Sequence, residues 1–306
     1  MPINLSNDTQ NTIEQMLCAA CVLEATARKP GNVHPQASFV DLNYEHFIIS
    51  ARTVAPILAR TRQLGVGRAI YEAVAATRER VDRNTNLGIV LLLAPLAAVP
   101  ADVRLANGIS EVLNNLSRDD ADFAYRAIRL AHPGGMGRVA SQDINQPPTQ
   151  TLLEVMRLAA DRDQIARQYV ENFSLVIEFG LPYLTNMLDF EGQAGEPYWF
   201  ARQWESAIVG LQLELLSRHN DSLVVRKCGL ETADEVSCRA AAVLNAAQAG
   251  TRVAQEELQA FDHWLRADGH RRNPGTTADL IAAMLFAAFR DGGVPVFQAA
   301  PQNDGI

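Results

Sequence analysis

Lysine is almost absent from this chain of 306 residues, although arginine is common. The two lysines lie in matching contexts, because residues 28–31 read RKPG and residues 226–229 read RKCG. A compact ammonium beside a glycine, which lets backbone approach a ligand closely, is a plausible phosphate contact. Lys29 and Lys227 are therefore candidates for binding phosphate, with stray lysines in an arginine-rich chain as the alternative.

An overall excess of positive charge is lacking as well. The formal net charge is −8, which excludes a general basic surface of the kind that binds nucleic acid. We therefore expect no nucleic-acid partner, and any phosphate-bearing ligand must be bound locally.

The chain also lacks long apolar runs, a visible secretion signal and an abundance of cysteine. The longest apolar run covers residues 87–98, well short of the roughly 20 residues of a membrane span, so it predicts a buried helix. Residues 1–10 contain neither a basic segment nor an apolar one, so we expect a cytoplasmic protein without a secretory signal. The Cys18–Cys21 spacing has no second pair that would complete a metal site. We expect free, buried thiols at Cys18, Cys21, Cys228 and Cys238.

Strict alternation of apolar and polar residues is nearly absent, whereas helical periodicity extends along most of the chain. We therefore predict an all-α fold, a single globular domain over residues 1–306 built as a bundle of roughly twelve helices, with a loosely ordered tail at 291–306. Alanine-rich helices of this kind pack closely and could also line the face of a homodimer. The expected helices cover residues 9–27, 43–62, 66–80, 86–98, 101–115, 118–131, 149–160, 163–187, 196–217, 230–248, 252–267 and 277–290.

One carboxylate interrupts the apolar face of the first expected helix. Glu24 falls on the same stripe as Ile13, Leu17 and Ala20, close to the helix end. A surface glutamate at an imperfectly periodic helix end would explain it. The alternative is a carboxylate that faces a cleft, as a metal ligand or a general base.

A second polar cluster, Asn84-Thr85-Asn86, directly precedes the apolar run that starts with Leu87 and Gly88. One residue is enough to cap a helix, and here there are three. The free N–H groups and positive dipole end of a buried helix also favour an anion, and Gly88 permits close approach.

A third cluster, residues 273–279 (NPGTTAD), precedes the last expected helix. With Thr276 as N-cap, Asp279 would complete a capping box, but the Asn-Pro-Gly before it is more turn chemistry than a cap requires. Asp221, shortly before Arg226, could either cap a helix or hold a divalent cation on a nucleotide. We expect these clusters to surround a central cleft for a polyphosphate and its metal ion.

These motifs, in this order, resemble the triphosphoribosyl-dephospho-CoA synthase family. That family has a glutamate followed by Pro-Lys-Pro-Gly-Leu-Val-Asp, for which Glu24 and residues 28–34 (RKPGNVH) stand here. Its Asn-Thr-His-Lys-Gly segment resembles residues 84–88 (NTNLG), and its Asp-Thr-Asn…Arg segment resembles residues 221–226. Its Ser-Pro-Gly-Gly-Ser-Ala-Asp-Leu segment resembles residues 273–280 (NPGTTADL). The resemblance spans roughly residues 10–290 and implies an all-helical fold, in agreement with the periodicity.

The resemblance implies a reaction in which the 2′-hydroxyl of 3′-dephospho-CoA displaces adenine from C1′ of ATP, so that the triphosphoribosyl group is transferred. It implies Mg²⁺ as cofactor, held by Asp221 and Asp279, and Glu24 or Asp41 as the base. The residues expected to bind phosphate or nucleotide are Lys29, Gly31, Asn32, His34, Asn84, Thr85, Asn86, Gly88, Arg226, Lys227, Asn273, Gly275 and Thr277.

The chain departs from the family pattern at several of these positions. Asn86-Leu87 stand where the family has His-Lys, and Asn32 and His34 replace Leu and Asp. Phe39 stands about where a histidine precedes the aspartate matched by Asp41, and Ser222-Leu223 replace Thr-Asn. This form resembles a divergent branch found in archaea and one-carbon-metabolising bacteria. The alternative to 3′-dephospho-CoA is therefore a different acceptor, or a different donor as well, in the synthesis of pterin- or furan-type one-carbon carriers.

Other classes of protein remain as alternatives. An ADP-ribosylglycohydrolase-type magnesium hydrolase would need clustered aspartates, and the acids here are scattered. A His-Asp phosphohydrolase is disfavoured because the sequence contains no His-Asp dipeptide. A non-catalytic helical protein that binds nucleotide would explain the missing His-Lys pair.

Overall fold

The computed structural model describes residues 12–131, 146–188, 197–249 and 251–296. Within these ranges the chain folds into helices and connecting loops, and a single isolated bridge between His34 and Ala37 stands in place of any strand. The prediction of an all-α fold is confirmed.

The helices follow one another along the chain with short connections. In order they are α1 (Ile13–Thr26), α2 (Tyr44–Leu58), α3 (Thr61–Leu64), α4 (Val66–Val81), α5 (Leu87–Ala98), α6 (Leu105–Asn114), α7 (Arg118–Ala131), α8 (Leu152–Ala159), α9 (Gln164–Val170), a π-helical segment (Leu175–Gly180), α10 (Leu181–Met187), α11 (Pro197–Arg218), α12 (Ser222–Cys228), α13 (Leu230–Ala249), α14 (Thr251–Arg266) and α15 (Gly275–Asp291).

Most of the helices expected from the sequence are present, and three differences have local causes. The helix expected at 43–62 is divided, because the chain leaves helical geometry after Leu58 and starts again at Thr61. The helix expected at 163–187 is also divided, since Asn172 and Phe173 adopt positive φ angles that end α9. The short helix α12 has no counterpart among the expected helices, and its seven residues are too few for periodicity to detect.

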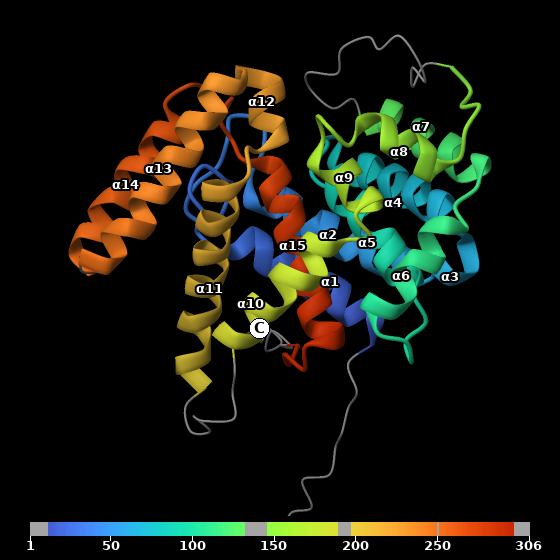
Figure 1. The fold of residues 1–306 in the computed structure, drawn as a ribbon, viewed down its shortest axis with the longest axis horizontal. Helices are drawn as coiled ribbons and strands as arrows, with labels where there is room; N and C mark the ends of the chain where they lie inside the picture. The colour runs from blue at the N-terminus through green and yellow to red at the C-terminus, as the bar shows by residue number, and fades with distance from the viewer. Residues whose placement is uncertain (1–11, 132–145, 189–196, 250, 297–306) are drawn as a thin grey trace, which may run out of the picture.

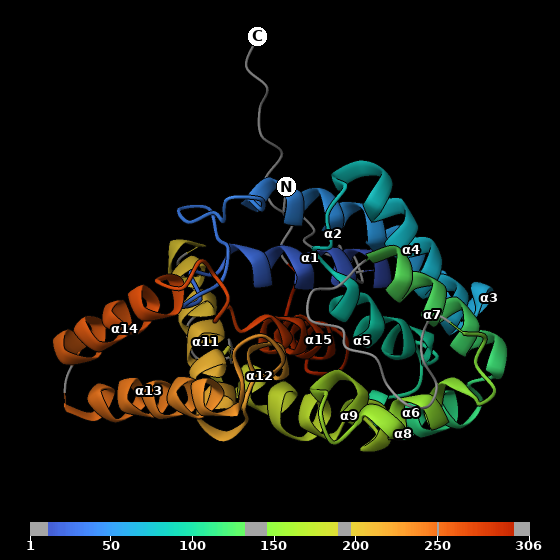
Figure 2. The same ribbon diagram turned by 90° about the horizontal axis from the view of Figure 1, so that it is seen from above.

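Two apolar helices, α5 and α15, form the centre of the molecule. Residues 87–97 of α5 are all buried, as expected for that run, and α15 is buried from Thr276 through Phe289 except at Asp279. Figure 2 shows α5 and α15 between the layer of α1, α2 and α4 and the layer of α8 and α9. Helices that are apolar on all sides are stable only when other elements surround them.

The remaining helices pack around two hydrophobic clusters. The larger cluster contains α5 and α15, and the smaller one joins α12, α13 and α14. Helix α11 contributes to both, with Leu211 and Leu215 in the larger cluster and Leu213 and Leu216 in the smaller. The α13–α14 hairpin extends from one end of the molecule (Figures 1 and 2). The single domain remains a prediction.

Several other expectations concern the surface and the chain ends. In the described part of the chain, no helix has both the length and the hydropathy of a membrane span. The four cysteines are free, as expected, but Cys238 is exposed and so the prediction that all four are buried is wrong. Of the expected loose tail, residues 297–306 lie outside the described residues.

Leu92 tests how much the core around α5 contributes to stability. Leu92 is fully buried, so Leu92→Ala should lower the free energy of unfolding by about 2–5 kcal/mol through lost burial and a cavity. The matched control is Leu230→Ala, because Leu230 is 60% exposed and should change stability by less than about 0.5 kcal/mol. Urea denaturation followed by circular dichroism measures both. Equal losses would contradict the placement of α5 at the centre.

Candidate active site

A cavity of about 1260 Å³ opens where α1, α5, α12 and α15 meet. Its wall is polar at these helix ends and largely apolar where α7, α8 and α9 line it. The apolar part is formed by Ala124, Tyr125, Ile128, Leu152, Val155, Met156, Ile165 and Ala166. Such a cavity can hold a ligand that combines charged groups with an apolar part.

Glu24 lies in the polar wall, on the buried face of α1. Its side chain is only 5% exposed, and its carboxylate forms an ion pair of 2.9 Å with Lys29, which is fully buried. The Lys29 ammonium also donates a hydrogen bond to the backbone carbonyl of Glu24 at the end of α1. This confirms that Glu24 faces inward. Lys29 itself lies behind the cavity wall, where it is the partner of Glu24 and contacts no open space.

The start of α5 forms the opposite wall. The side-chain oxygen Oδ1 of Asn84 accepts a hydrogen bond of 3.2 Å from the Leu87 N–H. The Thr85 hydroxyl bonds to Ser50 on α2 (2.5 Å), and the Asn86 amide donates to Thr77 on α4 (3.1 Å). One of the three polar residues thus caps the helix, and the other two attach it to its neighbours. Asn86 makes no side-chain cap, so N–H groups of the first turn remain available to an anion.

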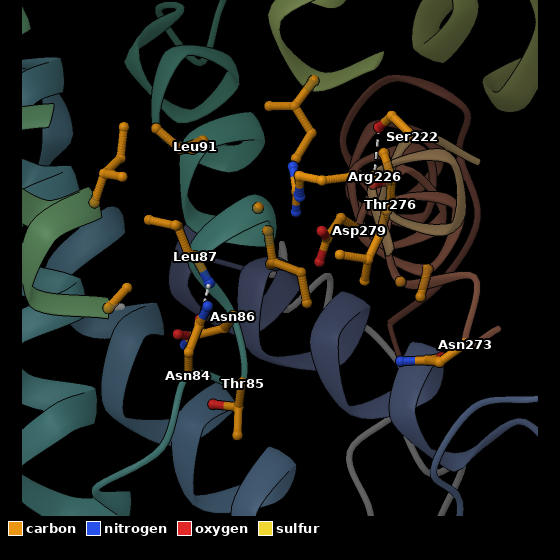
Figure 3. Close-up of a pocket in the computed structure, with 18 of the residues that line it drawn as sticks. Asn84, Thr85, Asn86, Leu87, Leu91, Ser222, Arg226, Asn273, Thr276 and Asp279 are labelled. Atoms are coloured by element: carbon orange, nitrogen blue, oxygen red, sulfur yellow. Dashed lines mark hydrogen bonds between the residues drawn. The ribbon is translucent and has the colours of Figure 1, made fainter. Parts of the chain in front are cut away.

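Asp279, from α15, lies against the start of α5. A Cβ atom at Gly88 would come within 2.0 Å of an Asp279 carboxylate oxygen, so only glycine permits this approach. Figure 3 shows Asp279 and Arg226 across the cavity from residues 84–87. Burial raises the pKa of Asp279 well above its ordinary value, and Glu24 and Asp221 raise it further, while Arg226 lowers it. No hydrogen bond to Asp279 is found in the described part of the structure, which leaves its carboxyl group open to a ligand.

Asp221 has a different environment from Asp279, although the sequence predicts both as magnesium ligands near the start of a helix. One oxygen accepts hydrogen bonds from the N–H groups of Leu223 and Val224 (2.9 and 3.1 Å), and the other accepts from the N–H and hydroxyl of Thr277 (2.7 and 2.8 Å). Asp221 is 1% exposed and does not line the cavity. It therefore joins the starts of α12 and α15. The capping box of Thr276 and Asp279 is wrong, because α15 starts at Gly275 and Asp221 takes the capping role.

Two cations extend from the last turn of α12 into the cavity wall. Arg226 forms a loose ion pair of 3.6 Å with Asp163, so much of its hydrogen-bonding capacity is free. Burial lowers the pKa of Lys227, and the neighbouring Arg226 lowers it further. Both side chains could move to a phosphate without breaking a strong existing contact.

The loop after α1 supports the wall from behind. Gly31 has a φ of 75° and packs too closely on Leu265 for any side chain. Asn32 reaches the cavity and donates to the Asn273 side chain (2.6 Å). Burial lowers the pKa of His34 to about 4, and the Arg266 guanidinium contributes, so His34 is neutral at pH 7.

The structure divides the residues expected at the site into two groups. Those that line the cavity are Glu24, Asn32, Asp41, Asn84, Thr85, Asn86, Gly88, Arg226, Lys227, Asn273, Gly275 and Asp279. Those that lie outside its lining are Lys29, Gly31, His34, Asp221 and Thr277. In the second group, Lys29 supports Glu24, and the contact between Asp221 and Thr277 joins the starts of α12 and α15.

Sequence reasoning missed four arginines that line the cavity: Arg78, Arg83, Arg162 and Arg271. Arg83 directly precedes Asn84, and Arg271 lies close before Asn273, so proximity to the expected motifs could have indicated both. Arg78 and Arg162 carry no such signal, because folding alone brings them to the site.

A comparison with protein-family models matches residues 10–295 to the family described as ATP:dephospho-CoA triphosphoribosyl transferase. The chain belongs to this family. A solved structure from Archaeoglobus fulgidus, provisionally assigned as a triphosphoribosyl-dephospho-CoA synthase, is 28% identical with a TM-score of 0.57, and the match covers 79% of this chain and 98% of that one. A comparison with curated proteins finds no match. The resemblance predicted from the sequence is confirmed. By its description, this family consists of transferases.

The buried ion pair between Lys29 and Glu24 gives a first prediction for the site. Lys29→Met should lower the free energy of unfolding by about 3–5 kcal/mol, because the charge of Glu24 would stay buried without a partner. The double variant Lys29→Met/Glu24→Gln should recover most of the loss. Urea denaturation of the single and double variants tests this. A phosphate contact at Lys29 would instead leave stability unchanged and weaken nucleotide binding.

Asp221 and Asp279 give a second, paired prediction. Asp221→Asn should cost about 2–4 kcal/mol, since it disturbs the hydrogen bonds that join two helix starts. Asp279→Asn should leave stability at pH 7 unchanged or raise it. The pKa of Asp279 is raised in the folded protein, so above about pH 4 the folded state binds a proton that the unfolded state has lost. The free energy of unfolding of the unsubstituted protein, relative to that of Asp279→Asn, should therefore fall as the pH rises above about 4. Urea denaturation of both proteins between pH 4 and 8 measures this difference in the free energy of unfolding. A difference that rises with pH would contradict a raised pKa for Asp279.

Proposed function

We propose that this chain transfers the 5-triphosphoribosyl group of ATP to a hydroxyl acceptor bound in the cavity, with release of adenine, and that 3′-dephospho-CoA is the first acceptor to test. The observation that carries the proposal is the meeting of Glu24, Asp279 and Arg226 around one cavity in a chain of this family. Transfer from a sugar that carries a triphosphate requires a carboxylate to accept a proton, an acidic group open to a metal ion, and a cation that is free to bind phosphate.

The triphosphate would bind between α5 and α12. The N–H groups at the start of α5 favour negative charge, and Arg226 and Lys227 supply cations from the facing side. Asn84 and Asn273 offer neutral donors at the two helix starts. This arrangement binds phosphate in a chain whose net charge is negative.

Glu24 is the better of the two candidates for the base. Asp41 lies on the exposed rim of the cavity, whereas Glu24 is buried in its wall and oriented by Lys29. In the proposed step, Glu24 accepts the proton of the acceptor hydroxyl as its oxygen bonds to C1′. The bond between C1′ and the adenine nitrogen breaks, adenine leaves with the electron pair, and the proton passes from Glu24 to adenine or solvent.

The cavity fits a magnesium ion that arrives with its nucleotide. Mg²⁺ often binds one or two carboxylates together with substrate phosphates. Asp279, open to the cavity and without a hydrogen bond, is suited to this role. Asp221 is not, because its oxygens are already bound. When present, Mg²⁺ would neutralise phosphate charge.

The acceptor is the part of the proposal that the departures from the family pattern affect most. The apolar wall formed by α7, α8 and α9 would hold an uncharged part of the acceptor. Where the family has His-Lys, Asn86 and Leu87 lie at the wall that would face the reacting sugar. An acceptor from one-carbon-carrier synthesis is therefore the second candidate, and a non-catalytic nucleotide-binding protein is the third. We further propose a cytoplasmic location, small-molecule substrates and a homodimer.

Release of adenine tests the reaction directly. The purified protein with Mg-ATP and 3′-dephospho-CoA should form free adenine, measured by chromatography, and should form none without an acceptor. Adenine that appears only with a one-carbon-carrier precursor would support the second candidate. Magnesium-dependent ATP binding without adenine from any acceptor would support the third, and failure to bind ATP would reject all three.

Glu24→Gln separates catalysis from binding in the same assay. It should lower turnover about 100-fold, because the base is lost, while ATP binding stays within about threefold. Glu235→Gln is the control, since Glu235 forms a surface pair with Arg239 on α13. Unchanged turnover in Glu24→Gln would contradict its role as base.

A further inference from the structure

Two aromatic rings from distant parts of the sequence stack at the rim of the cavity. The rings of Phe39 and His270 have centroids 3.9 Å apart and an angle of 28° between their planes. Both residues line the cavity, Phe39 from the loop before α2 and His270 from the loop before α15. The other ring pairs found in the described structure, such as Tyr71–Phe123 and Tyr169–Phe173, are not pairs of cavity-lining residues.

The backbone adopts an uncommon conformation to present the His270 ring. Gly269 and His270 have φ angles of 55° and 61°, and the left-handed region is unfavourable for a residue with a side chain. Non-glycine residues in such conformations tend to occur at functional sites. The stack is therefore more than a chance contact of two loops.

The His270 ring is held by its face and not by its edge. Its Nδ1 atom is buried and has no hydrogen-bond partner in the described structure. Burial lowers the pKa of His270, and Arg266 lowers it further while Asp41 raises it, and this shift favours the neutral ring. A neutral imidazole stacked on a phenyl ring offers a flat surface that suits a neutral heteroaromatic ligand.

We propose that the Phe39–His270 stack is the subsite for a purine base, which lies against the pair and extends it. The cavity also places Asp41 and Arg271 beside the stack, as an acceptor for an exocyclic amine and a donor for a ring nitrogen. Both the nucleotide donor and 3′-dephospho-CoA carry adenine, so the purine comes from one of these two. In this respect the inference rests on the proposed function. It assigns Asp41 to recognition of the purine, and not to the role of catalytic base.

Binding calorimetry with three ligands tests the subsite. Phe39→Leu keeps an apolar side chain without the ring, and His270→Asn keeps a residue that tolerates the left-handed conformation. Stacking on one base contributes about 1–3 kcal/mol, so each variant should weaken binding of one purine ligand by roughly 5- to 150-fold. Tripolyphosphate, which has no purine, should bind to both variants with the same affinity as to the unsubstituted protein.

The two purine ligands distinguish the source of the base. Weaker binding of Mg-ATP alone would assign the subsite to the donor, and weaker binding of 3′-dephospho-CoA alone would assign it to the acceptor. Phe179→Leu is the matched control, because Phe179 pairs with Tyr183 away from the cavity and should change neither affinity.

The inference is overturned if both variants bind both purine ligands as tightly as the unsubstituted protein does. It is also overturned if the affinity for tripolyphosphate falls as much as the affinity for the purine ligands, or if the unsubstituted protein binds neither purine ligand. These measurements need no turnover. A protein that binds ATP through this stack but releases no adenine would retain the subsite and reject the proposed reaction.

Discussion

Complete burial of two apolar helices is the constraint on which the rest of the structure depends. Helices α5 and α15 have no polar face, so every side must be covered by neighbouring helices. Their N-terminal turns are then also inside the protein, where the free N–H groups need polar partners. The Asn84 side chain and Asp221 each accept a hydrogen bond from one of these N–H groups, and the remaining N–H groups at the start of α5 are available to a ligand in the cavity.

The residues around the cavity fall into a supporting layer and an open layer, and hydrogen bonding separates the two. Asp221 accepts four hydrogen bonds and joins α12 to α15, whereas Asp279 accepts none from the residues that the structure describes. Glu24 stands between these cases, because Lys29 supports it from behind and the cavity reaches it from the front. A buried carboxylate without a full set of partners is costly, and this cost is typical of groups that meet a ligand.

Membership of the triphosphoribosyl transferase family agrees with this division. The supporting contacts involve Lys29, Gly31 and Asp221, which lie within motifs that match the family pattern. Several departures, at Asn32, Asn86 and Phe39, concern residues that line the cavity. His34, another departure, lies outside the cavity lining. The departures within the lining are the basis for leaving the acceptor open while the transferase chemistry is proposed.

The sequence alone determined the all-α fold and the burial of α5, because helical periodicity is a local property of the chain. For Glu24 it left a surface position and a cleft position open, and the structure places this residue inside. The sequence also located the polar clusters at helix starts, since capping chemistry depends on neighbouring residues. Only the tertiary structure decided which polar residue meets the cavity. Asp221 and Asp279 are equally plausible ligands in sequence, and their roles differ because Thr277 folds onto one and Gly88 leaves room for the other. The stack of Phe39 on His270 likewise joins residues far apart in the chain, and no local pattern can encode such a contact.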